Sequence, residues 1–207
     1  MDLPADLSLP LERGAPWWYW LGGRPALDFT NTFRERWNRR VETLVTGADL
    51  GEWLVAAKLL DAVPPVTEPL LVRARELREA IDAGVVAALA GDPVPDATLA
   101  ALARELPHAA RPDTVERRED GTLVLVPAPP ADRAEHGLAL VARDAAEMFG
   151  AASAHRIRVC ASATCSARFY DRSAAAGRRW CSSRGCGNVE KARRHRRRQR
   201  ATTETKP

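Results

Sequence analysis

Apolar residues recur every three to four positions over several stretches of the chain, and this spacing predicts amphipathic helices. The clearest stretch covers residues 68–90, where Leu77, Ile81 and Val85 fall on one face and Gly91 follows as a stop signal. A second pattern begins at Asp28, whose neighbours are of the types that cap helix starts. We therefore expect a helix from there towards Arg40. Three further helices are expected over 49–57, 96–106 and 131–150.

The pattern changes from helical to alternating in two places. Residues 113–127 hold the apolar run 123–126 after Asp120-Gly121, and the Asp-Gly pair is a strong signal for a two-stranded hairpin. Residues 155–160 alternate between polar and apolar positions and predict a strand that leads into the first cysteine. The chain is thus expected to be mostly helical with a small β-hairpin.

Charge divides the 207 residues into two parts, although the formal net charge is only +4. Residues 1–150 hold 16 Lys and Arg against 24 Asp and Glu, a net −8, whereas residues 151–207 hold 15 against 3, a net +12. Such asymmetry predicts two parts with different partners. The longest apolar stretch, 84–90, is far shorter than the roughly 20 residues of a membrane span. Residues 1–6 lack the features of a secretory signal, so we expect a cytoplasmic protein without membrane association.

All four cysteines lie in the basic part, with the spacing Cys160-x4-Cys165-x15-Cys181-x4-Cys186. Two close pairs joined by a loop of this length fit a tetrahedral four-thiolate site, in which each pair forms one knuckle. Soft sulfur ligands favour one Zn2+, with an iron–sulfur cluster as the alternative; two disulfides are disfavoured in the expected cytosolic location. Because four thiolates leave no open coordination position, the zinc is expected to be structural.

A dense run of cations follows the last cysteine, over residues 191–200. Such a run is often only a solvated surface, but directly beside a zinc module it favours nucleic acid, most simply DNA, with RNA as the alternative. Counterion release from six phosphate contacts would lower log K by about 5 per log unit of salt. The residues predicted to contact nucleic acid are Arg178, Arg179, Lys191, Arg193, Arg194, Arg196, Arg197 and Arg198.

Five of the six tryptophans precede residue 54, including three in the aromatic block 17–20. Packing is the simplest role for this block, and a ligand-binding site using Trp20, Asp28 and Asn31 is the alternative. No nucleophile–base pair, phosphate loop or open metal site is evident in the sequence. We therefore expect a protein that is not an enzyme.

The C-terminal segment 158–195, with its runs Arg178-Arg179-Trp180-Cys181-Ser182 and Cys186-Gly187-Asn188, resembles the CGNR zinc finger. Upstream, Pro25-Ala26-Leu27-Asp28-Phe29-Thr30-Asn31-Thr32 and the later Leu50…Trp53-Leu54 resemble the ABATE domain, which usually precedes that finger in bacterial proteins. The sequence departs from the finger's naming motif at Val189, where the family has Arg. If that Arg contacts DNA, this chain has lost one contact, while its zinc ligands are intact.

The resemblance implies a bacterial transcription regulator linked to the stress response, which binds one zinc ion through the four cysteines and DNA through the finger. It also implies a sensing or ligand-binding N-terminal domain with a small-molecule effector; a homodimer is a further expectation. An RNA- or ribosome-associated zinc protein and a protein–protein interaction module are the alternatives. The expected architecture is an extended arm (1–16), a mainly α N-terminal domain with a small β-hairpin (17–150), a short four-cysteine zinc-finger module with a basic helix (155–200) and a disordered tail (201–207).

Overall fold

The chain forms two compact units that do not follow its order in sequence. The computed structural model describes residues 18–110, 114–126, 133–150 and 154–204, with only the backbone described at 200–204. We call residues 44–155 the helical unit, and residues 1–43 together with 156–207 the split unit. The domain boundary predicted near residue 150 divides the chain at one point along the sequence. By contacts, the described residues 18–43 group with the C-terminal segment instead. The predicted arm over 1–16 lies outside the described residues.

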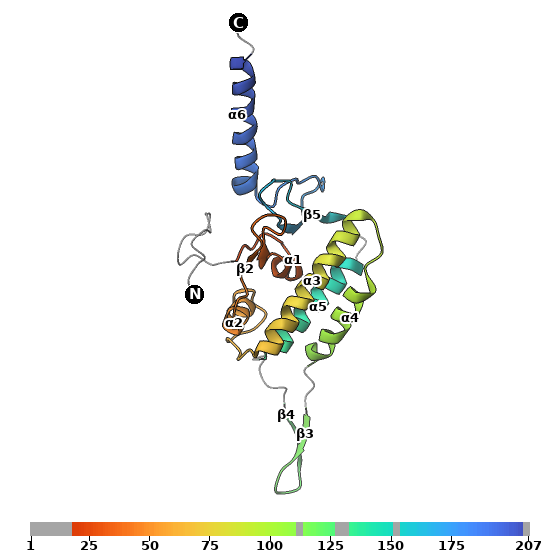
Figure 1. Cartoon of the computed structure of the whole chain (residues 1–207). Helices are drawn as coiled ribbons and strands as arrows, with labels where there is room; N and C mark the ends of the chain where they lie inside the picture. Colours follow the sequence, from red (N-terminus) through yellow and green to blue (C-terminus); the bar gives the residue numbers. More distant parts are fainter. Residues whose placement is uncertain (1–17, 111–113, 127–132, 151–153, 205–207) are drawn as a thin grey trace. The chain divides into compact units, whose positions relative to one another are not determined.

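Three helices of the helical unit, α3, α4 and α5, lie side by side and pack through their apolar faces (Figure 1). Leu77 and Ile81 of α3, Leu138 and Met148 of α5, and Trp53 of α2 are fully buried. The apolar spacing seen in the sequence therefore marks the core, as predicted. The elements of this bundle are α2 (Gly47–Ala56), α3 (Glu68–Ala90), α4 (Asp96–Glu105), the 3-10 helix η1 (Leu106–Ala109) and α5 (Ala134–Gly150).

Local signals define the ends of two of these helices. Thr46 and Asp49 form a capping box before α2, in which the Asp49 amide donates to Thr46 Oγ1 (3.4 Å) and the Thr46 amide donates to Asp49 Oδ2 (2.6 Å). Gly91 ends α3 with a φ of 79°, a left-handed conformation that glycine adopts without steric cost. Both ends lie within two residues of the predicted positions.

The predicted hairpin is present as antiparallel strands β3 (Thr114–Arg117) and β4 (Leu123–Val126). Gly121 adopts a φ of 86° in its turn, and the Asp120 carboxylate accepts a hydrogen bond from the Thr122 amide at 2.9 Å. The apolar side chains of Val115, Leu123 and Leu125 are exposed. The Asp-Gly signal thus identified the turn correctly.

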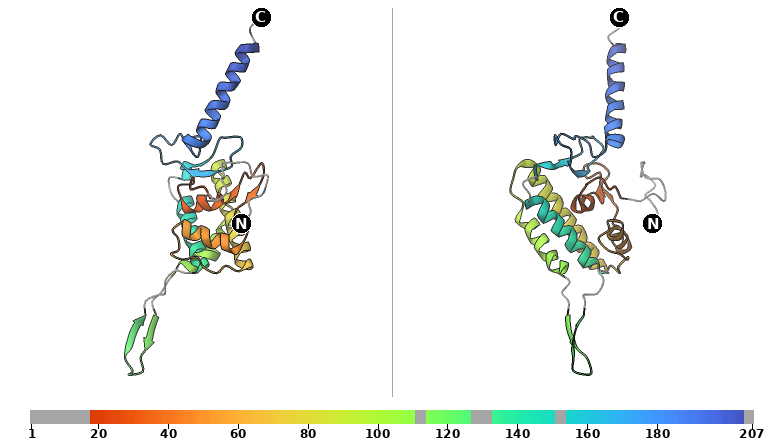
Figure 2. Two further views of the ribbon diagram at one scale, coloured as in Figure 1. Left: turned by 90° about the vertical axis from the view of Figure 1, so that its left-hand side faces the viewer. Right: turned by 180° about the vertical axis from the view of Figure 1, so that it is seen from behind.

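The split unit consists of short elements and one long helix, α6, which continues from the cysteine-rich segment as a single rod (Figure 2). Strands β5 and β6 form an antiparallel pair in which Val159 lies opposite Arg168. Helix α6 reaches Glu204, so residues 201–204 of the predicted disordered tail are helical. The elements are α1 (Pro25–Thr30), β1 (Phe33–Arg34), β2 (Val41–Glu42), the short η2 (Ala154–Arg156), β5 (Ile157–Val159), β6 (Arg168–Tyr170), the π-helical turn η3 (Ser183–Gly187) and α6 (Asn188–Glu204).

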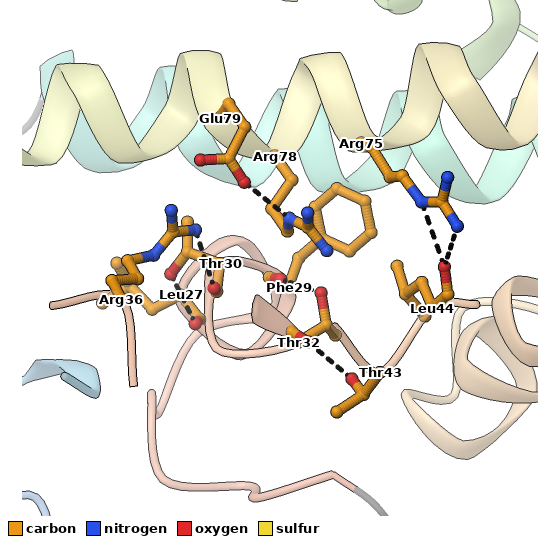
Figure 3. A network of polar contacts seen from close by, with 10 residues as sticks. All are labelled: Leu27, Phe29, Thr30, Thr32, Arg36, Thr43, Leu44, Arg75, Arg78 and Glu79. Atoms are coloured by element: carbon orange, nitrogen blue, oxygen red, sulfur yellow. Dashed lines mark hydrogen bonds and ion pairs between the residues drawn. The ribbon is translucent and has the colours of Figure 1, made fainter. Parts of the chain in front are cut away.

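The prediction of a helix from Asp28 towards Arg40 is wrong, because α1 ends at Thr30 and the chain continues into β1 and β2. The hydroxyls of Thr30 and Thr32 donate to the carbonyls of Leu27 and Phe29, and Thr43 donates through its hydroxyl to the Thr32 carbonyl at 2.6 Å (Figure 3). Side chains that hydrogen-bond nearby backbone compete with helix propagation. The cap expected at Asp28 is wrong as well, because α1 begins at Pro25 after Arg24, which forms no side-chain cap, and the threonine hydroxyls bind carbonyls at the end of this short helix.

None of the helices in the described ranges combines the length and the apolar character needed to cross a membrane.

Candidate metal centre and basic helix

The first cysteine pair lies in the loop between β5 and β6. The Cys160 amide donates to the Ala167 carbonyl at 2.9 Å, which continues the strand pairing into the loop. The Cys165 amide donates to the Ser162 carbonyl, and the Ala167 amide points to the sulfur of Cys165 at 3.5 Å. This antiparallel hairpin brings the two thiols together at one end, as expected for a zinc knuckle.

The second pair flanks the turn η3 just before α6. Ser182 shapes this turn, since its hydroxyl accepts a hydrogen bond from the Gly185 amide (3.0 Å) and its carbonyl accepts one from the Gly187 amide (2.9 Å). Cys181 precedes the turn and Cys186 lies within it. Because α6 begins at Asn188, the second knuckle runs directly into the basic helix.

The four sulfurs come together at one point: all lie within 4.8 Å of one another. The separation is 3.9 Å between the sulfurs of Cys165 and Cys181, and 3.8 Å between those of Cys181 and Cys186. A tetrahedral Zn–S bond of about 2.3 Å requires sulfurs about 3.8 Å apart. The donor set and its spacing therefore fit one zinc ion, and four thiolates fill its coordination shell, as predicted.

The thiols also show why a cation belongs among them. Hydrogen bonds, of which the one from the Cys165 thiol has the largest effect, hold the pKa of Cys160 far below its usual value. The hydrogen bonds that Cys165 and Cys181 make to Cys160 raise the pKa of both of these thiols. The pKa of Cys186 is also lowered, so protons alone stabilise the thiolates of Cys160 and Cys186 at the expense of those of Cys165 and Cys181. A bound Zn2+ balances the charge of all four thiolates together, so metal binding releases protons.

A small apolar cluster that includes Phe169 and Trp180 supports the metal centre. Phe169 is fully buried with Cys160, Ala167 and Cys181, and the partly buried Trp180 packs against this cluster. So few apolar side chains bury too little surface to fold this module alone, and metal binding supplies the remaining stabilisation.

Asp171 holds the loop between the two cysteine pairs. Its buried carboxylate accepts hydrogen bonds from the amides of Ser173 (2.9 Å) and Arg178 (2.7 Å), a pattern typical of an Asp turn. Burial alone would raise the pKa of Asp171, but these hydrogen bonds outweigh it and hold the pKa below its usual value. The loop is therefore anchored by an ionised carboxylate.

The structure adds a contact that the sequence does not reveal: residues 18–43 pack onto the finger. The side-chain amide of Asn31 donates to the Arg168 carbonyl (2.9 Å), and its oxygen accepts from the Arg168 amide (2.8 Å). The Tyr170 amide donates to the Gly22 carbonyl at 2.8 Å, and the Arg36 amide donates to Ser166 Oγ at 3.0 Å. The Asn31 side chain therefore pairs with the backbone of β6 as a neighbouring strand would, although 137 residues separate Asn31 from Arg168 in the sequence.

The three residues predicted to bind a ligand lie in this same segment. Trp20 is 43% exposed, and the Asp28 carboxylate accepts a hydrogen bond from the Gly22 amide at 2.7 Å. Asp28 and Asn31 therefore both make structural contacts inside the split unit. Ligand binding by these three residues stays a prediction.

The predicted nucleic-acid residues fall into three groups. Arg178 is turned towards the metal centre, where its guanidinium donates to the Cys181 carbonyl (2.7 Å) and lies 5.1 Å from the centre of the Phe169 ring. Five of them line a cavity between the finger and the first half of α6: Arg179, Lys191, Arg193, Arg194 and Arg197. Arg196 and Arg198 belong to α6 but do not line this cavity.

A polar contact that was not predicted joins the first knuckle to α6. The buried Ser162 donates through its hydroxyl to Glu190 Oε1 at 3.0 Å, and Glu190 also pairs with Arg193 at 3.3 Å. Glu190 lies in the first turn of α6, where a carboxylate also interacts favourably with the positive end of the helix dipole. Nothing in the spacing of residues 162 and 190 indicates that they meet.

The comparisons with known proteins agree with this geometry. Residues 23–152 match the ABATE family, described as "putative stress-induced transcription regulator", and residues 156–199 match the CGNR zinc finger. A search of curated proteins found no match to the chain. The first match covers more than half of the sequence, and the second contains all four cysteines. With its four-sulfur centre leading into α6, the chain belongs to the ABATE family and carries a C-terminal CGNR zinc finger.

Proposed function

We propose that the protein is a DNA-binding transcription regulator without enzymatic activity, and that α6 is its main nucleic-acid-binding element. The observation that carries this proposal is the direct connection of the four-cysteine centre to α6. The turn η3 fixes where the helix begins, and the Ser162–Glu190 hydrogen bond ties its first turn to the first knuckle. A zinc ion at the centre would thereby position a strongly basic helix.

The charge of α6 supports a polyanionic partner. Its 17 residues contain seven Lys and Arg against two Glu, and like charges at helical spacing repel one another. Phosphates would relieve this repulsion and release counterions from the nucleic acid. Such contacts position a protein on DNA without specifying a sequence. The same argument favours strong salt dependence, with a slope of about −5 for six contacts.

The test is fluorescence anisotropy of a labelled 20-base-pair DNA duplex with the zinc-loaded full chain. The control is a variant in which all four cysteines are Ser. We expect the wild type to bind with steep salt dependence and the variant to bind at least about tenfold more weakly, because its basic helix has no fixed start. Equal and salt-insensitive binding by both proteins would refute the proposal. Competition with a structured RNA separates DNA from the RNA- or ribosome-associated alternative, which predicts the stronger competition from RNA.

Sensing is part of the same proposal and is assigned to the ABATE region. The exposed ring of Trp20 supports a small-molecule effector at the edge of the segment that packs on the finger. Thermal shift of the full chain with a metabolite panel tests this assignment. A ligand that raises the melting temperature of wild type but not of Trp20→Ala supports it, whereas no shift with any compound counts against it.

A further inference from the structure

A cavity of about 270 Å³ lies within the split unit, between the finger and the first half of α6. Arg179 and Trp180 from the finger line one side, and Lys191, Arg194 and Arg197 from α6 line the other. Figure 2 shows where α6 leaves the finger. The lining thus combines an aromatic ring with a row of cations.

The cations of this row are not neutralised by the protein. Glu190 is the one acidic residue that lines the cavity, and it already accepts hydrogen bonds from Ser162 (3.0 Å) and Arg193 (3.3 Å). In the part of the chain that the structure describes, the side chains of Lys191, Arg194 and Arg197 have no hydrogen-bond or ion-pair partner. Three like charges spaced three residues apart on one helix repel one another, and an anion held between them would be stabilised.

The Trp180 ring in the lining indicates which class of anion the cavity binds. Arg179 lies 5.4 Å from the centre of the Trp180 ring, and this ring packs against the metal cluster, so its position is fixed before any ligand binds. A fixed aromatic ring beside cations is the combination that holds single-stranded nucleic acids, because the base packs on the ring while the cations contact phosphate. In a continuous duplex the bases stay stacked inside the helix and cannot reach such a ring.

We propose that this cavity binds one unpaired nucleotide of a DNA strand, with its phosphate at Lys191, Arg194 and Arg197 and its base against Trp180. The inference rests on the proposed function, since it requires α6 to bind nucleic acid. It goes further because it assigns an unpaired nucleotide as the ligand of the residues of α6 and the finger that line the cavity. The cations of α6 that do not line the cavity would then contribute mainly through their charge.

Helix α6 offers a matched control for the test. Arg194→Gln/Arg197→Gln removes two cations from the cavity, whereas Arg196→Gln/Arg198→Gln removes the same charge from positions that do not line it. Both variants are made in the zinc-loaded full chain, and metal content and circular dichroism confirm that they fold. The ligands are labelled dT12, a 20-base-pair duplex and, as a competitor, the mononucleotide dTMP.

We expect the cavity variant to bind dT12 about tenfold more weakly than the control variant, while the two differ by less than about threefold on duplex. Trp180→Phe, which keeps an aromatic ring against the metal cluster, should weaken dT12 binding several-fold and leave duplex binding unchanged. Equal losses in the cavity and control variants, or equal losses on dT12 and duplex, would overturn the inference. So would dTMP that competes as well as dT12, because the site would then belong to a free nucleotide. Wild-type protein that binds neither DNA would refute the proposed function instead.

Discussion

The two compact units reach a stable fold by different means. The helical unit buries large apolar side chains from three packed helices, such as Leu71, Ile81 and Leu138. Around the metal centre of the split unit, two of the four buried cluster members are ligand cysteines, and Phe169 is the one large apolar side chain among them. The comparison indicates that the first unit folds by apolar burial, whereas the finger needs metal and hydrogen bonds to the N-terminal segment.

The largest expected effect is that of Cys181→Ser, which removes one zinc ligand from the centre of the sulfur cluster. Structural zinc contributes about 10–16 kcal/mol of apparent binding free energy in finger peptides, so its loss should unfold the finger. Circular dichroism should show that the helical unit still melts cooperatively, while metal analysis falls from one zinc per chain to none. Full zinc content in this variant would contradict the four-cysteine centre.

The converse change is Leu77→Ala in the fully buried face of α3. It should lower the free energy of unfolding of the helical unit by about 2–5 kcal/mol, because it leaves a cavity between packed helices. Denaturant unfolding followed by circular dichroism measures this loss. The zinc content should stay at one per chain. Loss of zinc along with helix stability would contradict the account that the finger is held by metal and the helical unit by apolar burial.

A change at Asn31 tests the contact between the N-terminal segment and the finger. Asn31→Ala removes two hydrogen bonds to the Arg168 backbone and leaves a buried amide and carbonyl unpaired, at a cost of about 2–4 kcal/mol. We expect weaker zinc binding, measured by competition with a chromophoric chelator. Asn31→Asp keeps the acceptor for the Arg168 amide and should lose less. Unchanged zinc affinity in Asn31→Ala would show that residues 18–43 do not support the finger.

The smallest effect is expected at Val189, which is 54% exposed in the first turn of α6 and stands where the family has Arg. Val189→Arg adds one cation on a helix that already begins at a fixed place. The salt slope of duplex binding should steepen by about 0.9, and affinity at low salt should rise a few-fold. Val189→Gln serves as the uncharged control. An identical slope in both variants would remove this position from the DNA-binding face.

The sequence predicted local features well and distant contacts poorly. Apolar spacing and Gly91 placed α3 to the residue, and the cysteine spacing identified a metal site whose sulfurs do meet. Those signals act within one element or across a short loop. The helix expected towards Arg40 failed because short threonine and asparagine side chains hydrogen-bond backbone in several conformations, and tertiary context decides which one forms.

Polar contacts between residues far apart in the chain produce no periodic pattern in the sequence. Asn31 reads equally well as a helix cap, a ligand contact or a partner of β6, and the structure places it against Arg168. Ser162 and Glu190 are likewise ordinary surface types until the fold brings them within 3.0 Å. The division of the chain into units follows from such contacts, which is why residues 18–43 could not be assigned to the finger from composition.

The central claim is that the zinc centre organises α6 for binding DNA. The most direct measurement is a titration of zinc into metal-free full-length protein, with duplex binding followed by fluorescence anisotropy at low salt. Binding should rise with added zinc and saturate at one equivalent per chain, in step with zinc occupancy of the four cysteines. Full-strength duplex binding by the metal-free protein, unchanged as zinc is added, would contradict the account.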